Sequence, residues 1–328
     1  MKKCYGKRPG AVFMSVVMIA LLLGGCQKRD AATGDGTKIY YTAIESGDYY
    51  EGWANQLQEQ AKKSGCDFDV GYAENSVETQ EAQVKGAVSN GYNVLLCGLV
   101  SADIATEIKA AAKDVPIVFI NQAPDDRQLM KNRYVYVASD EYMAGQYQAE
   151  YILEKFKGKE EINVAILKGP KGASGAIGRT NGLKQTLKAS GKKIHYVFED
   201  NADWSAETAQ EMIGMLLKTG RTVDCVAANN DDMAQGAVTA FEEAGIDLNS
   251  VLFLGVDASE TGCQSIADGK MDFTVYQPTS EQISVAVEAA RKLAEGKSIE
   301  DMDGVSEDGK YILIPFEKVD ASNVAKYM

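Results

Sequence analysis

Polar and aromatic residues recur at one kind of position in this sequence, directly after short apolar segments that are typical of strands. These residues are Asp48, Tyr50, Asn121, Arg179, Trp204, Asn230, Asp257 and Gln277. Carboxylate, amide and guanidinium groups can form paired hydrogen bonds, which matches the neighbouring hydroxyl groups of a polyhydroxylated ring. The apolar C–H faces of such a ring pack on flat aromatic side chains. The pattern therefore predicts a binding site for a sugar-like small molecule.

A simpler interpretation is that each polar residue caps the helix that follows it. Asp and Asn side chains accept hydrogen bonds from the first free amides of a helix, so Asp48 and Asn230, taken alone, favour capping. Capping explains the same choice of residue types at seven strand ends less well. We therefore interpret the set as a ligand-binding site.

Catalytic and metal-binding patterns are weak by comparison. His195 is the only histidine and falls within an expected strand, so we interpret it as a strand residue. Catalytic triads and histidine-rich metal sites are therefore not expected. The acidic pairs Asp125-Asp126 and Asp231-Asp232 are expected to be solvated faces or caps, because adjacent side chains on a helix or turn diverge. We expect no enzymatic activity, no metal and no cofactor.

The glycine-rich segment Gly169–Arg179 follows an expected strand and enters a helix. Its glycines at positions 172, 175 and 178 do not fit the dinucleotide pattern G-x-G-x-x-G, and no Gly-Lys-Ser/Thr is present. We expect a turn that approaches a small ligand closely, in preference to a nucleotide site.

Short apolar segments alternate with amphipathic ones along the chain. The expected strands are Lys38–Ile44, Asp67–Tyr72, Asn93–Leu96 and Pro116–Ile120, then Asn163–Leu167, Lys193–Phe198, Val223–Ala227 and Val251–Gly255. The clearest helix is Ser205–Thr219, which Ser205 can cap and Gly220 ends. Alternating strands and helices with near-continuous apolar strands indicate parallel sheets that are covered on both faces.

The pattern starts again near Ile162, which predicts an α/β fold of two doubly wound, Rossmann-like lobes. The expected crossings between the lobes are Tyr134–Asp140, Thr274–Pro278 and Ile312–Phe316. The N-terminal lobe would then contain residues 38–138 plus 279–313, and the C-terminal lobe residues 139–278 plus 314–328. Ligands of open α/β sheets bind beyond the carboxyl ends of the strands, so two facing lobes predict a cleft.

The N-terminus has the order of a secretory signal peptide over residues 1–25. A basic head (Lys2, Lys3, Lys7 and Arg8) precedes the apolar stretch Ala11–Leu23, which is too short for a finished spanning helix. The ending Leu23-Gly24-Gly25-Cys26 resembles a bacterial lipobox, which implies cleavage before Cys26 and lipid attachment to its sulfur. Residues 26–37 would be a flexible leash, and the protein would be extracytoplasmic and anchored to the cell membrane. The alternative is an ordinary signal peptide with an incidental cysteine.

The charge and the cysteine content of the chain limit its possible partners and functions further. Without residues 1–25 the net charge changes from −13 to −17, which argues against nucleic acid or an anionic membrane surface as partner. The same acidic body, with a signal in place of an N-terminal helix-turn-helix, disfavours a transcription repressor. Cys97 and Cys225 are expected to be buried thiols, and a Cys66–Cys97 disulfide stays open for an exported protein.

From Lys38 to Met328 the chain resembles the periplasmic galactose/glucose- and ribose-binding proteins that feed sugar ABC transporters. The matching stretches are Ala228–Ala237 (Ala-Asn-Asn-Asp-Asp-Met-Ala-Gln-Gly-Ala), Gly255–Ala258, Leu167–Gly169, Asp203–Ser205 and Ile314–Phe316. The resemblance implies the type I periplasmic binding protein fold, in which three hinge segments join the two lobes.

The resemblance also implies roles for single residues. Asp48 matches a sugar-hydroxyl acceptor, and Tyr50 and Trp204 match the two aromatics that enclose the ring. Hydrogen-bonding positions of the family match Asn121, Arg179, Asn230 and Asp257. Gln277 stands where galactose binders carry Asn and ribose binders carry Gln.

Two departures from the galactose pattern affect the expected ligand. Ala173 and Gly175 stand where the galactose binders carry a His and an Asp before the arginine, which predicts a roomier or less polar corner. No calcium loop is evident around Phe156–Ile162. We therefore expect no structural calcium and leave galactose, glucose, ribose, inositol and related polyols open. The resemblance implies a monomer that delivers its ligand to an ABC permease. The alternative is a receptor that presents ligand to a membrane kinase or chemoreceptor.

Overall fold

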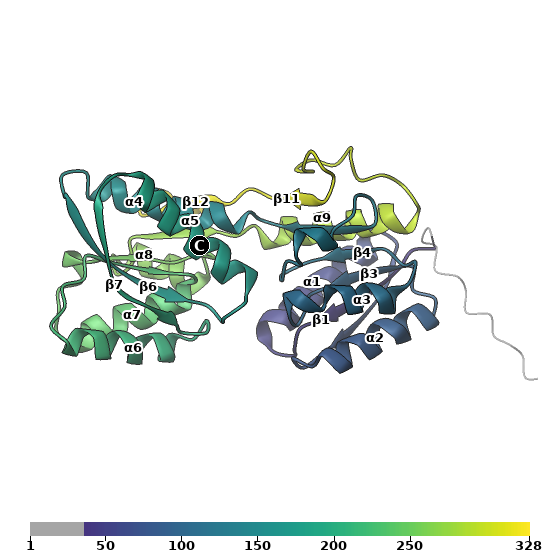
Figure 1. Cartoon of the computed structure of the whole chain (residues 1–328), viewed down its shortest axis with the longest axis horizontal. Helices are drawn as coiled ribbons and strands as arrows, with labels where there is room; N and C mark the ends of the chain where they lie inside the picture. The colour runs from purple at the N-terminus through teal and green to yellow at the C-terminus, as the bar shows by residue number, and fades with distance from the viewer. Residues whose placement is uncertain (1–35) are drawn as a thin grey trace, which may run out of the picture. The chain divides into compact units, whose positions relative to one another are not determined.

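The computed structural model describes residues 36–328. The expected signal peptide, Cys26 and nearly all of the leash fall among residues 1–35, outside the described residues. The described chain forms two six-stranded sheets, each covered by helices on both faces (Figure 1). Among these residues, no helix combines the length and apolar character needed to cross a membrane.

The first sheet is parallel throughout. Its strands are β1 (Lys38–Ala43), β2 (Asp67–Tyr72), β3 (Val94–Cys97), β4 (Ile117–Phe119), β5 (Tyr134–Ala138) and β11 (Tyr311–Leu313). They lie in the order β11-β5-β4-β3-β1-β2. Strands β3, β4 and β5 are buried over their whole length, as expected for parallel strands between two helical layers.

The helices of this first lobe are α1 (Asp48–Lys63), α2 (Val77–Ser89), α3 (Ala105–Ala112) and α9 (Thr279–Ala294). Helices α1 and α9 share one core, in which Leu57 packs with Ile283 and Val287. Helices α2 and α3 cover the opposite face through Val84 and Ile108. The helix α9 thus returns to the first lobe although it follows the second lobe in sequence.

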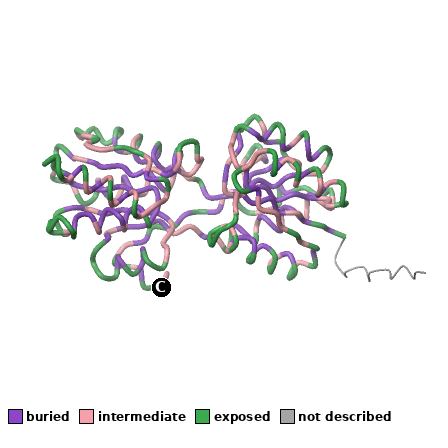
Figure 2. Tube along the Cα trace, turned by 90° about the horizontal axis from the view of Figure 1, so that it is seen from below, coloured by how far each residue is buried: buried purple, intermediate pink, exposed green. Residues whose placement is uncertain are grey.

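The second sheet is parallel except at one edge. Its strands are β6 (Glu161–Lys168), β7 (Lys193–Asn201), β8 (Cys225–Ala228), β9 (Leu252–Leu254), β10 (Phe273–Tyr276) and β12 (Glu317–Asp320). They lie in the order β12-β10-β9-β8-β6-β7, with β12 antiparallel to β10. The buried segments run through the interior of each lobe in Figure 2.

The helices of this second lobe are α4 (Glu141–Lys155), α5 (Ser174–Ala189), α6 (Ala206–Lys218), α7 (Asp231–Glu243) and α8 (Glu260–Ala267). Helices α4 and α5 cover one face, and α6, α7 and α8 cover the other. Short 3-10 helices are η1 (Ala102–Ile104), η2 (Asp126–Gln128), η3 (Leu248–Ser250) and η4 (Val324–Lys326).

The predicted fold class is confirmed. Each of the eight expected strands overlaps an observed one, and Asp67–Tyr72 has the same bounds as β2. The expected helix is α6, and the hydroxyl of Ser205 accepts a hydrogen bond of 3.1 Å from the amide of Thr208. The chain passes between the sheets after β5, after β10 and after β11, inside the three expected segments. We propose residues 38–138 with 279–313, and 139–278 with 314–328, as the extents of the two lobes.

The two central cysteines behave as small apolar residues. Cys97 in β3 and Cys225 in β8 are fully buried, and burial raises the pKa of both thiols above the usual range. Cys97 is a free thiol, so the open question of a Cys66–Cys97 disulfide is answered against the bridge.

Helices α4 and α5 approach each other at two glycines. A Cβ atom at Gly145 would lie 1.8 Å from the carbonyl oxygen of Arg179, and one at Gly182 would lie 1.9 Å from that of Tyr142. Neither distance is compatible with a side chain, so this close approach requires glycine on both helices. The contact fixes where α5 places Arg179 relative to α4.

The substitution Gly145→Ala should lower the free energy of unfolding by about 1–3 kcal/mol, because the added methyl group overpacks the contact between α4 and α5. Urea denaturation of the variant measures this effect. Gly214→Ala in α6 is the matched control, because a Cβ atom there meets nothing within 4 Å. That change should stabilise by about 0.5–1 kcal/mol through helix propensity. Equal effects of the two changes would contradict the proposed role of Gly145.

Candidate functional site

A cavity of about 360 Å³ is lined by residues of both lobes. The first lobe supplies Ile44, Glu45, Tyr49, Tyr50, Asn121 and Gln122, and the rest are Glu141, Ala173, Gly175, Arg179, Trp204, Asn230, Asp232, Asp257 and Gln277. Its volume lies at the lower end of the range typical of small-molecule sites. The structure brings seven of the eight residues predicted from sequence to this one cavity.

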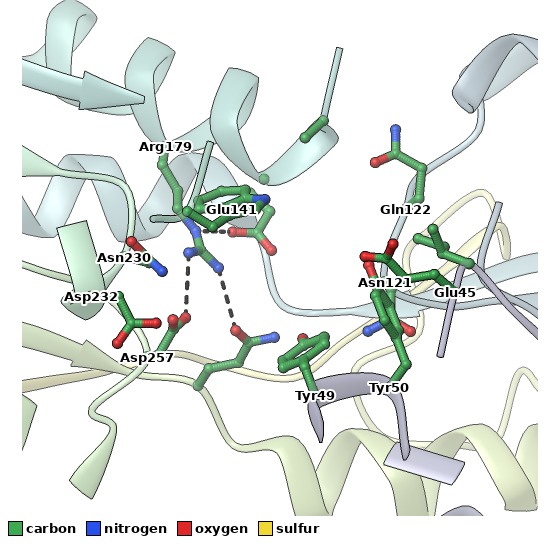
Figure 3. Close-up of a pocket in the computed structure, with 15 residues that line it drawn as sticks. Glu45, Tyr49, Tyr50, Asn121, Gln122, Glu141, Arg179, Asn230, Asp232 and Asp257 are labelled. Carbon is green, nitrogen blue, oxygen red and sulfur yellow. Dashed lines mark hydrogen bonds and ion pairs between the residues drawn. The ribbon is translucent and has the colours of Figure 1, made fainter. Parts of the chain in front are cut away.

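The cavity forms where strands of both sheets end. Asn121 follows β4, Asp257 follows β9 and Gln277 follows β10. Parallel strands present their carboxyl ends at one edge of a sheet, so residues far apart in sequence meet there. In Figure 3 the labelled side chains form two groups, one from each lobe, on opposite sides of the cavity.

Arg179 is the centre of the second-lobe group. Its side chain is only 6% exposed, and its Nε donates to the Glu141 carboxylate at 2.6 Å. Its Nη1 donates to the carbonyl oxygen of Asn229 at 2.6 Å and to Asp257 at 3.4 Å, and its Nη2 donates to Gln277 at 3.3 Å. Burial lowers the pKa of Arg179, but the charges of Glu141 and Asp257 outweigh it, so the net pKa is raised and the guanidinium stays protonated.

Glu141 reaches Arg179 because α5 carries no side chain at Gly178. A Cβ atom at Gly178 would lie 2.6 Å from the Cβ of Glu141. Glu141 itself lies in the first turn of α4, where a negative charge is favourable. The glycine-rich segment that sequence suggested as a close-approach turn thus makes room for a carboxylate partner of Arg179.

Trp204 depends on a second close approach. A Cβ atom at Gly169 would lie 2.2 Å from the Trp204 ring, so only glycine leaves space for the indole. Trp204 has φ of 65°, a left-handed conformation that is rare for an aromatic residue. The guanidinium carbon of Arg179 lies 5.8 Å from the ring centroid, within reach of a cation–π contact.

A buried carboxylate holds the turn that carries Asp257. Asp231 is 1% exposed and accepts hydrogen bonds from the amide and hydroxyl of Ser259 at 2.8 and 3.0 Å. It also accepts one from the Thr274 hydroxyl at 2.6 Å, and its amide donates to the carbonyl oxygen of Val256 at 2.9 Å. Asp257 has φ of 119°, and these bonds on both sides offset the strain of that conformation.

Removal from water raises the pKa of Asp257, and Arg179 lowers it. The nearby carboxylates of Asp231, Glu141 and Asp232 raise it as well. The net pKa is higher than that of an ordinary aspartate, because burial, together with the acidic neighbours, outweighs the one guanidinium.

Asn230 fits both interpretations that the sequence left open, helix capping and ligand binding. Its side-chain oxygen accepts a hydrogen bond of 3.1 Å from the amide of Met233 and so caps α7. The same side chain lines the cavity, which leaves its amide nitrogen for a ligand. Capping and binding therefore do not exclude each other at this position.

Asp48 is the predicted site residue that the structure does not bring to the cavity. It is the first residue of α1, is exposed and forms no capping hydrogen bond with its side chain. The next residue, Tyr49, lines the cavity in its place, with its ring 5.1 Å from that of Tyr50. One residue along a helix rotates the side chain by about 100°, which is enough to exchange the two positions.

Several cavity residues were not predicted from sequence. These are Ile44, Glu45, Tyr49, Gln122, Glu141 and Asp232. Gln122 directly follows Asn121 at the end of β4, and Glu141 is the first residue of the helix after β5. Both could have been predicted, because polar residues that follow strands were the signal for the other site residues. His195 lies on β7 beside Glu161, with Nε2 2.9 Å from the carboxylate, outside this set.

The two lobes also contact each other directly beside the cavity. The Gln122 side chain accepts from the amide of Ser174 at 3.2 Å and donates to the carbonyl oxygen of Gly172 at 3.2 Å. The amide of Ala123 donates to the Ser174 hydroxyl at 3.1 Å. These bonds join the end of β4 to the start of α5, the helix that carries Arg179.

The fold and the position of this cavity define a two-lobed binding protein. The family model described as "Periplasmic binding protein domain" matches residues 39–298. The chain therefore belongs to the periplasmic binding protein family, as its sequence predicted. Membership implies, at the level of the family, an extracytoplasmic binding protein and not an enzyme.

Individual relatives are moderately similar to the chain. A putative rhizopine-binding protein of Rhizobium meliloti is 29% identical, over 83% of this chain and 86% of the relative. A xylitol-binding protein of Mycolicibacterium smegmatis is 28% identical, over 86% and 79%. An ABC transporter solute binding protein from Bacillus halodurans, solved with bound myo-inositol, is 26% identical with a TM-score of 0.77, over 90% and 98%.

The substitution Glu141→Ala should lower the free energy of unfolding by about 3 kcal/mol, because it removes the closest charged partner of a buried guanidinium. Urea denaturation measures the change. Glu154→Ala on the same helix removes an exposed carboxylate 4.0 Å from Lys157 and should change stability by less than about 0.5 kcal/mol. A Glu141 variant as stable as the Glu154 variant would contradict the importance of this ion pair.

Proposed function

We propose that this protein binds a small monosaccharide or polyol in the cavity between its lobes and delivers it to an ABC sugar permease. The observation that carries the proposal is the lining of the cavity. Planar hydrogen-bonding groups (Asn121, Asn230, Asp257 and Gln277) lie there together with the aromatic rings of Tyr49, Tyr50 and Trp204. Hydroxyl groups both donate and accept, so they match such groups, and the aromatic rings match the C–H faces of a ring.

The relatives support a hydroxyl-rich ligand. One of them is named for xylitol, and one solved structure holds myo-inositol. Both molecules carry a hydroxyl group on each ring or chain carbon, which is the chemistry inferred from the lining. The corner at Ala173 and Gly175, where galactose binders carry larger polar residues, also lines the cavity.

Ligand binding would favour closure of the lobes. A ligand that contacts Asn121 in the first lobe and Asp257 in the second gains both sets of bonds only when the lobes approach. The contact of Gln122 with Ser174 beside the cavity would strengthen that state. The closed form would then dock on the permease.

Lipid attachment at Cys26 would hold the protein near that permease. The support is the order of basic head, apolar stretch and Leu23-Gly24-Gly25-Cys26 in the sequence. A second candidate in the same fold is a sensing receptor that presents ligand to a membrane kinase or chemoreceptor. Loss of uptake of radiolabelled ligand on deletion of the gene would support transport, whereas retained uptake with a lost response would support sensing.

The substitution Trp204→Ala should weaken ligand binding by about 1–3 kcal/mol, or about 5- to 150-fold in Kd, through loss of a large aromatic surface. Isothermal titration calorimetry against ribose, galactose, glucose, xylitol and myo-inositol first identifies a ligand and then measures the variant. Tyr196→Ala is the control, because this aromatic of the same lobe lies on β7 outside the cavity lining. Unchanged affinity in the Trp204 variant would remove that ring from the site.

The substitution Cys26→Ala should abolish incorporation of labelled fatty acid and release the protein from the membrane fraction, because it removes the only sulfur at the lipobox position. Metabolic labelling followed by fractionation measures both effects. Cys4→Ala is the matched control, because that cysteine precedes the expected cleavage site and should leave labelling unchanged. Label retained in the Cys26 variant would contradict lipidation at this residue.

A further inference from the structure

The cavity has an unbalanced set of charges. Four carboxylates line it (Glu45, Glu141, Asp232 and Asp257), but Arg179 is the only cationic side chain among the described residues that do so. A neutral polyol does not require this excess of negative charge. An anionic ligand would be repelled by it.

Arg179 has at most one N–H group left for a ligand, because four of its five donate to protein oxygens. Nε, Nη1 and Nη2 all donate to protein oxygens, and the guanidinium is held between Glu141 and Asp257. Its positive charge therefore offsets these two carboxylates at most in part. In the described part of the chain, the carboxylates of Asp232 and Glu45 form no ion pair with a cationic side chain.

Asp232 is the acidic group most available to a ligand. It lies in the first turn of α7, and within residues 36–328 its carboxylate has no hydrogen bond or ion pair. Figure 3 shows it beside Asp257, and its charge raises the pKa of Asp257. A positive charge between the two carboxylates would relieve their repulsion.

The opposite wall adds acceptors and no cation. The side-chain oxygen of Asn121 is buried and has no hydrogen-bond partner. The carboxylate of Glu45 accepts a hydrogen bond of 2.5 Å from the side-chain Nδ2 of Asn75. Both walls therefore favour a ligand that donates more hydrogen bonds than it accepts. A protonated amine supplies three donors and no acceptor.

We propose that the ligand is a protonated amino-substituted polyol of monosaccharide size, an amino sugar or an aminocyclitol, with its ammonium group at Asp232 and Asp257. This inference rests on the proposed function and narrows its ligand class. The ring lies against Trp204, and its hydroxyl groups contact Asn121 and Asn230. The charge-assisted hydrogen bonds of the ammonium group supply the selectivity over the neutral counterpart.

The test compares matched ligands that differ only in the amine. Isothermal titration calorimetry at pH 7 with the purified full-length chain in detergent uses glucose with glucosamine, galactose with galactosamine, and myo-inositol with an amino-substituted inositol. N-acetylglucosamine keeps the nitrogen but carries a larger, neutral acetamide in place of the ammonium group. At least one amine should bind about 10- to 100-fold more tightly than its neutral partner, and N-acetylation should remove the gain.

The variant Asp232→Asn should reduce affinity for the amine by about 10-fold and so remove most of the advantage of the amine over its neutral partner. Glu260→Gln is the matched control, because it removes an exposed acidic group in the first turn of α8, outside the cavity. Equal melting temperatures of the two variants verify that the effect is not a folding defect.

The outcomes separate the two proposals. If neutral polyols bind and no amine exceeds its neutral partner, this inference is overturned and the proposed function stands. If neither class binds, both are overturned. An amine preference that Asp232→Asn leaves intact also overturns the assignment of the ammonium group to Asp232.

Discussion

The buried guanidinium of Arg179 is the interaction on which the site depends. A single side chain joins the start of α4, the end of β8, the turn after β9 and the segment after β10. An isolated buried charge would be strongly destabilising, so each of these elements must lie where its oxygen meets the guanidinium. The second-lobe wall of the cavity is therefore preorganised by an ion that has little capacity left for the ligand.

The backbone geometry at the site is also determined by close contacts between neighbouring elements. Glycines at positions 169 and 178 leave space for Trp204 and Glu141, and Asn121, Trp204 and Asp257 adopt positive φ values. Each such conformation costs of the order of 1–3 kcal/mol, and the surrounding hydrogen bonds must offset it. The network around Asp231 does so for the Asp257 turn. Three residues that line the cavity thus carry backbone strain.

Strand periodicity was sufficient to predict the two lobes, because buried parallel strands form apolar runs that local sequence reveals. It also placed Asn121 at the carboxyl edge of the first sheet and Asp257 and Gln277 at that of the second, since parallel strands of one sheet end at the same edge. It did not show whether Asp48 or Tyr49 faces the cavity, or whether Asp231 or Asp232 does. Adjacent residues of a helix differ in the direction of their side chains, which the strand pattern does not reveal. It did not pair Glu141 with Arg179, since that pairing arises from the packing of α4 on α5 through Gly145 and Gly182.

The contrast between Asp231 and Asp232 shows how one helix start can serve structure and binding at once. Asp231 turns inward, where three donors satisfy it and fix the Asp257 turn. Asp232 turns to the cavity and keeps its charge unsatisfied by the protein. The helix N-terminus partly stabilises both charges, and Asp232 is in addition exposed. The proposed ligand, donor-rich and positively charged, would supply the part of the electrostatic balance of the site that the protein side chains leave open.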